Sequence, residues 1–150
     1  MSVETFHTNL KAQLTADAGL VGWANTHFAK TLTPIDGNVP IKNIDTEKLP
    51  ALVFEFDDGD KTGGLTVGGK RQLFNTALHV VFLWHEEDRA KAFTQRKQLS
   101  ELMAKAIMAN NNLSGAVGGA WLASWVPDRG VNHPRHVWRS KVAAEINVNL

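Results

Sequence analysis

Four histidines stand in positions where imidazole chemistry is conceivable. His133 and His136 are three residues apart, while His79 and His85 belong to an apolar segment or follow it directly. A metal centre requires three or four such groups to converge, with carboxylates behind them. No His-Glu-x-x-His spacing is present and cysteine is absent. We therefore interpret the two neighbouring histidines as part of a polar loop, and we expect no metal and no other cofactor.

An acidic and glycine-rich segment, residues 57–71, carries two further patterns. Asp57, Asp58 and Asp60 resemble the start of a calcium loop, but Gly68 stands where the closing glutamate belongs. The glycines and Lys70 resemble a phosphate-binding loop, yet the spacing differs and a strand, not a helix, is expected to follow. We interpret this segment as a solvated acidic turn that leads into a protruding hairpin.

Nucleophilic catalysis finds little support. The chain has no thiol, and its serines are outside any Gly-x-Ser-x-Gly elbow. We expect a protein that is not an enzyme. The alternative hypothesis is a small enzyme whose site lies between the glycine-rich segment and His79, His133 and His136.

Tryptophan and arginine are concentrated near residues 121–139. Trp121, Trp125 and Arg129 suit either base stacking on a single strand or the centre of a protein interface. Sixteen basic and fifteen acidic side chains leave a net charge of +1, far from the basic excess typical of nucleic-acid binding. The interface interpretation is therefore favoured, with no specific nucleic-acid partner. No apolar run approaches the roughly 20 residues of a membrane span, so we expect no membrane partner.

The elements that must position these residues are organised around residues 72–112. Residues 72–84 alternate Phe74, Thr76, Leu78 and their successors with a second set that is also mostly apolar, which predicts a strand covered on both faces. Three acids follow at positions 86–88, where a helix favours negative charge. An apolar stripe that includes Phe93 then predicts an amphipathic helix over residues 88–110.

The remaining segments complete an α+β domain. Ser2 is a plausible cap for a first helix, and residues 20–28 either extend that helix with a kink or begin another. Residues 31–48 predict an extended connection with at most a short edge strand at 39–44, and strands are predicted at 49–57, 120–126 and 137–150. Trp121 and Trp125 are expected on one face of their strand, and Trp138 in the core. The prediction is one domain over residues 1–150, in the order helix-strand-strand-helix-strand-strand. It has a mainly antiparallel four-stranded sheet and two helices on one face.

This layout resembles a known family. The order of elements is similar to that of the tail terminator (tail completion) proteins of lambda-like and Mu-like long-tailed bacteriophages. It consists of a first helix, an aperiodic link, the strand Leu-Pro-Ala-Leu-Val-Phe-Glu-Phe, a long loop, a strand ending at Trp84, a long helix and two closing strands. The resemblance spans nearly the whole chain and rests on element order and length, without a short motif.

The resemblance implies a structural virion protein in the phage tail, assembled in the host cytoplasm. It implies a ring of identical subunits, typically a hexamer, that caps the tail tube, ends tube polymerisation and offers a surface for head joining. Its partners are then copies of itself, the tail tube protein and the head–tail connector protein; another phage neck or minor tail component is the alternative. Candidate interface residues are Asp57, Asp58, Asp60, Leu65, Val67, Arg71, Trp121, Trp125 and Arg129.

Overall fold

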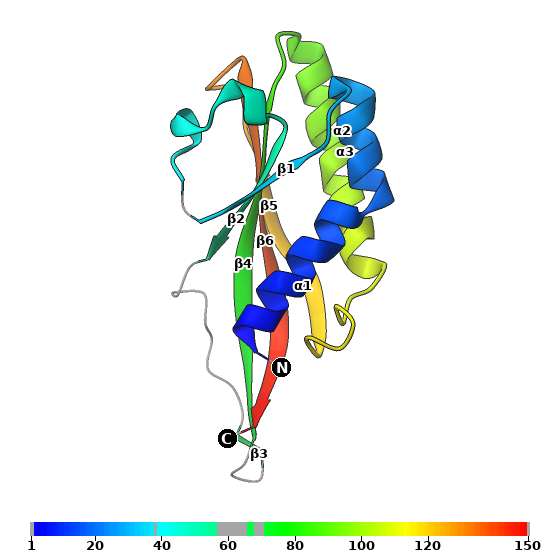
Figure 1. The fold of residues 1–150 in the computed structure, drawn as a ribbon, viewed down its shortest axis with the longest axis vertical. Helices are drawn as coiled ribbons and strands as arrows, with labels where there is room; N and C mark the ends of the chain where they lie inside the picture. Colours follow the sequence, from blue (N-terminus) through cyan, green and yellow to red (C-terminus); the bar gives the residue numbers. More distant parts are fainter. Residues whose placement is uncertain (1, 38, 57–65, 68–70, 150) are drawn as a thin grey trace.

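The chain folds as a sheet with helices against one of its faces (Figure 1). The computed structural model describes residues 2–37, 39–56, 66–67 and 71–149. The main path of the sheet is β1-β2-β4-β6-β5, and the short β3, Thr66–Val67, pairs with β4. The α+β class predicted from the sequence is confirmed.

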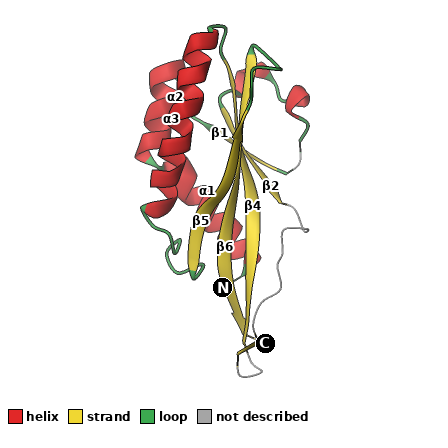
Figure 2. Cartoon of the chain, turned by 180° about the vertical axis from the view of Figure 1, so that it is seen from behind, coloured by secondary structure: helices red, strands yellow, loops and turns green. Residues whose placement is uncertain are grey.

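Two long antiparallel strands form the middle of the sheet. β4, Arg71–His85, and β6, Arg135–Asn149, pair along their whole length, from Arg71 opposite Asn149 to His85 opposite Arg135. β2, Ala51–Phe56, adds to the outer side of β4, and β5, Gly119–Pro127, adds to the outer side of β6. Figure 2 shows the same ladder from behind, where β4 and β6 run past the ends of their neighbours. These four antiparallel strands match the strands predicted from alternation.

Three helices cover one face of this sheet and enclose the main core. α1, Val3–Ala16, begins at Ser2, whose hydroxyl accepts from the Thr5 amide at 3.0 Å. α2, Ala18–Phe28, is a separate helix because Asp17 caps its first turn. α3, Arg89–Met108, begins at Asp88, whose carboxylate accepts from two amides of the first turn. Their buried side chains meet the even-numbered residues of the central strands, including Phe82, Trp84 and Trp138.

A second, smaller core lies on the opposite face of the sheet. Residues 39–50, which contain the short turns η1, Ile41–Asn43, and η2, Thr46–Lys48, place Ile44 and Leu49 over the odd-numbered side chains of β2, β4 and β6. This cover explains why Ala51 and Val53 are as buried as Leu52 and Phe54. The strand therefore reads as apolar on both faces instead of one.

The predicted arrangement was wrong in three respects. The described residues contain a third helix, α2, and a further strand, β1, Thr33–Asp36, which pairs with β2 in parallel. The short strand of the 31–48 connection is this β1, whereas residues 39–44, for which at most a short edge strand was predicted, cross the sheet as turns. Finally, a bulge in β5 between Leu122 and Ser124 changes which side chains share a face.

Candidate functional site at the β5 edge

β5 forms one edge of the sheet. Within the described residues it pairs on one side, with β6, so its other side presents backbone amides and carbonyls without a strand partner. Such an edge is a template for pairing with another chain unless it is short, charged or covered. Between Gly119 and Val126 the strand contains no charged residue.

Large apolar side chains remain exposed along this edge. Trp121 is 43% exposed, Trp125 50% and Val126 66%. Exposed indoles on a monomer surface are enriched at protein interfaces, where they supply large contact areas with few rotatable bonds. Trp121 and Trp125 are candidates that the sequence named, and both are exposed; Val126, which it did not name as a candidate, is exposed beside them.

The prediction that both tryptophans face the same way was wrong. Trp121 lies opposite Ala143, whereas Trp125 lies opposite Ser140. Ala143 and Ser140 are an odd number of residues apart on β6, so their side chains point to opposite faces of the sheet. Because the bulge adds one residue between the two tryptophans, Trp121 lies on the face away from the helices and Trp125 on the helix face. The two indoles thus straddle the edge.

A groove beside Trp125's end of the strand extends this surface onto α3. It has a volume of about 370 Å³. Phe93 is 56% exposed at this groove, and the Lys97 ammonium lies 4.9 Å from the centroid of its ring. Sequence reasoning placed Phe93 in the buried stripe of the helix. The observed buried stripe contains Ala92, Gln95, Leu99 and Met103. Phe93 is one position away from this stripe. Requiring buried residues to be three or four positions apart would have excluded Phe93, because it is six positions before Leu99.

Arg129 is exposed at the same groove, in the turn between β5 and β6. The Asp128 carboxylate accepts from the amides of Gly130 and Val131, and this fixes the turn. Arg129, Trp125 and Phe93 therefore combine apolar area with positive charge.

His133 and His136 form a histidine cluster next to that turn. His136 is buried, and its Nδ1 lies 3.2 Å from an Arg96 guanidinium nitrogen, which can only donate. Nδ1 is therefore the acceptor, and Nε2 carries the proton toward the Glu86 carbonyl oxygen at 3.1 Å and His133 Nδ1 at 3.3 Å. Burial, with Arg96 and His133 adding to it, lowers the pKa of His136 below its ordinary value, although the Glu86 bond and Asp128 oppose this. The imidazole is neutral and structural.

The same cluster fixes the start of α3. The indole of Trp84 donates to Gln95 Oε1 at 2.9 Å, and Gln95 Nε2 donates to Glu86 Oε1 at 2.9 Å. These bonds satisfy polar groups that would otherwise be buried without partners.

The three histidines of the enzyme hypothesis do not converge. His133 and His136 are in contact, but His79 lies in the middle of the sheet on the face away from the helices, opposite Glu55 and Lys141. Among the described residues, no three His, Asp or Glu side chains are grouped as metal ligands would be.

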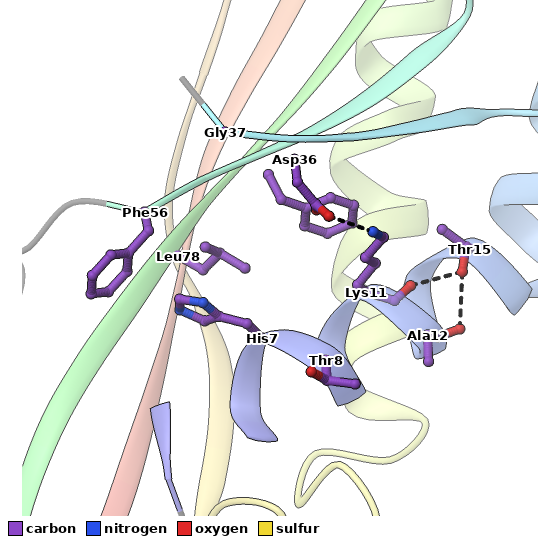
Figure 3. Close-up of a pocket in the computed structure, with 10 residues that line it drawn as sticks. His7, Thr8, Lys11, Ala12, Thr15, Asp36, Gly37, Phe56 and Leu78 are labelled. Atoms are coloured by element: carbon purple, nitrogen blue, oxygen red, sulfur yellow. Dashed lines mark hydrogen bonds and ion pairs between the residues drawn. The ribbon is translucent and has the colours of Figure 1, made fainter. Parts of the chain in front are cut away.

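A separate pocket of about 570 Å³ lies between α1 and the ends of β1 and β2 (Figure 3). Its polar groups are a Lys11–Asp36 ion pair at 2.7 Å and His7, which packs edge-on to Phe56 at 4.9 Å. Burial lowers the pKa of His7, and Asp36 offsets part of that effect. Thr15 donates to the Lys11 carbonyl, so its hydroxyl is occupied by its own helix. Thr8 supplies the other hydroxyl of the lining, but His7 Nε2 has no hydrogen-bond partner in the described part of the chain, so neither threonine is aligned with that imidazole nitrogen as a base.

Two other predicted interface residues that the structure describes, Val67 and Arg71, lie away from the β5 edge. Asp57, Asp58, Asp60 and Leu65 lie outside the described residues. Val67 pairs with Arg71 at the far end of the β4–β6 ladder, next to Asn149. Trp121, the predicted β5 residue nearest to that end, lies opposite Ala143, about six residues or roughly 20 Å from Asn149 along β6 at the rise of a strand. Val67 and Arg71 therefore do not form one continuous patch with Trp121, Trp125 and Arg129.

Comparison with known proteins leaves the family open. No protein-family model matches this chain, and no curated protein does. A solved structure of a protein that bears only a numerical designation is similar over 97% of this chain and 96% of its own, with 14% identity and a TM-score of 0.49. A likeness at this level assigns no function. None of the helices in the described part of the chain has the length and apolar character needed to cross a bilayer.

Proposed function

We propose that this protein is a non-enzymatic structural subunit that joins copies of itself through the β5 edge to form a closed ring. In the role that its resemblance to tail terminator proteins implies, the ring caps a phage tail tube and meets the tube protein on one side and the head–tail connector on the other. Its place is then the virion tail, after assembly in the host cytoplasm.

The observation that carries the proposal is the exposed outer side of β5. A nine-residue strand whose outer side has no strand partner among the described residues, and which carries two half-exposed indoles, has the composition of an interface centre, although the Ala120 amide at its start already donates to the Asn111 carbonyl at 2.7 Å. Because each indole is about half exposed, covering one removes roughly half of the about 150–250 Å² that a fully buried aromatic side chain hides from water. The straddling arrangement suits a partner that contacts both faces of the edge at once.

A ring also requires a second, different patch on each subunit. Two unlike surfaces that meet around a closed rotation generate a cyclic oligomer. The β3 end of the β4–β6 ladder, with Val67 and Arg71, lies at the opposite end of the strands from Arg129. It is the candidate for the complementary patch or for the contact with the tube.

The proposed absence of catalysis is supported by how polar groups are used. Hydrogen bonds join neighbouring elements through the side chains of Trp84, Gln95, Glu86 and His136. The pocket beside α1 contains an exposed ion pair and one imidazole. Neither arrangement presents a nucleophile beside a base, which acyl transfer or hydrolysis needs.

Sedimentation velocity with light scattering tests the proposal. Wild-type protein is expected to form a discrete oligomer, alone at high concentration or after addition of tail tube protein. Trp125→Glu should remain monomeric under both conditions. Met108→Glu is the matched control, because Met108 is 79% exposed but lies at the end of α3. A wild-type protein that stays monomeric at every concentration, with and without tube protein, would contradict the proposal.

A further inference from the structure

A second surface lies on the face of the sheet away from the helices. A cleft of about 820 Å³ runs between residues 39–42 and the start of β6. Its lining consists of Val39, Pro40, Lys42, Glu55, Asn132, His133, Arg135 and Arg139. The histidine cluster behind the β5–β6 turn touches it through His133, but none of the edge residues Trp121, Trp125 and Val126 belongs to it.

Positive charge dominates this cleft. Lys42, Arg135 and Arg139 line it, and Glu55 is the carboxylate among its lining residues. The Arg139–Glu55 pair is long, at 3.5 Å, and one Arg135 nitrogen donates to the neutral Thr46 hydroxyl at 3.1 Å. A guanidinium has five N–H donors. Counted over the lining residues alone, three cations and one carboxylate give a formal excess of two positive charges.

The spacing of the cations indicates an extended ligand. Arg135 and Arg139 are four residues apart on the same face of β6, which separates their backbones by roughly 13 Å. Lys42 approaches from the covering segment. A strand-like peptide carries same-side residues at intervals of about 7 Å, so two of its acidic side chains match the two arginines.

The rest of the lining discriminates between anions. Nucleic-acid single strands are held by aromatic platforms, and among the lining residues the ring of His133 is the sole aromatic one. Val39 and Pro40 offer apolar contact and Asn132 an amide, groups that suit a peptide. Carboxylates suit the planar guanidinium fork.

From this geometry we infer that the cleft binds an acidic, extended segment of a partner protein. Carboxylates of that segment pair with Arg135, Arg139 and Lys42, and an apolar side chain packs on Val39 and Pro40. The inference is independent of self-association at the β5 edge, because the two surfaces share no residue.

Fluorescence anisotropy tests the inference with the whole protein. The probe is a labelled ten-residue peptide that alternates Glu and Thr, in low salt. A peptide with Lys in place of Glu and a dT oligonucleotide of equal charge are the comparison probes. The acidic peptide should bind, the basic one should not, and the oligonucleotide should bind at least several-fold more weakly.

Four variants locate the binding. Arg139→Gln and Lys42→Gln should each weaken it about 5- to 10-fold, the effect of one charge-assisted contact. Glu55→Gln should tighten it about threefold, because a competing carboxylate is removed from Arg139. Lys105→Gln, on the exposed side of α3, is the matched control and should change nothing. A gain in affinity cannot arise from misfolding.

Three results would overturn the inference: no acidic-peptide binding in low salt, equal binding of the oligonucleotide, or affinities that ignore Arg139, Lys42 and Glu55. Binding that survives these substitutions but disappears with Trp125→Glu would instead place the acidic partner at the β5 edge and would also overturn it.

Discussion

The two edges of the sheet are built in opposite ways. β1 has four residues, includes Pro34, which has no N–H to donate, and ends at Asp36 in an ion pair with Lys11. β5 has nine residues, no charge from Gly119 to Val126, and two exposed indoles. Shortness, proline and charge are the devices by which proteins prevent edge pairing. The chain applies all three at β1. β5 contains a bulge and ends at Pro127, but its residues from Gly119 to Val126 are uncharged and include two exposed indoles, which indicates that this part of the edge is available for a partner.

The largest expected effect comes from removing both indoles of the β5 edge. Trp121→Glu combined with Trp125→Glu should weaken self-association at least ~1,000-fold, because interface tryptophans commonly contribute 2 kcal/mol or more each. Both side chains are already half-exposed, so the free energy of unfolding should change little. Sedimentation equilibrium measures the association constant. If the double variant assembles as the wild type does, β5 is not the edge through which the subunits associate.

A substitution behind the turn should separate folding from assembly. Gln95→Leu removes the acceptor of the buried Trp84 indole and the donor to Glu86. The free energy of unfolding should fall by about 1–3 kcal/mol, the cost of leaving a buried polar group unpaired. Urea denaturation followed by tryptophan fluorescence measures this fall. Gln98→Leu, at an exposed bond to His27, is the matched control and should cost less. Equal losses in the two variants would show that the cluster has no special role.

The sequence predicted the central unit of this fold for physical reasons. Alternation across β4, the acidic residues before α3 and the clean period of β6 are local signals, and they located the strands and the helix within a few residues. Trp138 was correctly assigned to the core, and Trp121, Trp125 and Arg129 were found exposed, as an interface requires.

The features that the sequence did not reveal depend on distant contacts. β1 is stabilised by parallel pairing with β2 and has no alternation of its own. The bulge in β5 is a one-residue change that period-two reasoning cannot locate, and it reversed the predicted direction of Trp125. The sequence could not predict that residues 39–50 cover β2, because this cover depends on contacts of Ile44 and Leu49 with distant residues such as Val81 and Val137.

A fall in pH should destabilise the fold through His136, which lies beside the turn between β5 and β6. The pKa of His136 is lowered in the folded state from its ordinary 6.5. The unfolded chain therefore binds more protons as pH falls below that value, and stability is lost there. Unfolding by urea at pH 7 and pH 5 should show a decrease that His136→Gln reduces. Burial also lowers the pKa of His7, so His7→Gln serves as the comparison. An unchanged pH dependence in His136→Gln would contradict the neutral buried imidazole.

The smallest effect is expected at β1. Asp36→Asn removes the carboxylate of an ion pair whose side chains are largely exposed, and such pairs contribute roughly 0–1 kcal/mol. The free energy of unfolding should change by less than ~0.5 kcal/mol after allowing for solvent screening, and assembly should be unaffected. Thermal unfolding and sedimentation check both. Loss of assembly in this variant would indicate that the interface lies at β1, which would contradict its assignment to β5.

Hydrogen–deuterium exchange at low and high protein concentration tests the edge assignment most directly. When copies associate, the amides of β5, Gly119–Pro127, should become protected while those of β1, Thr33–Asp36, keep their rates. Protection that appears at β1 or on the helices, with β5 exchange unchanged, would contradict the assignment of β5 as the surface through which the subunits join.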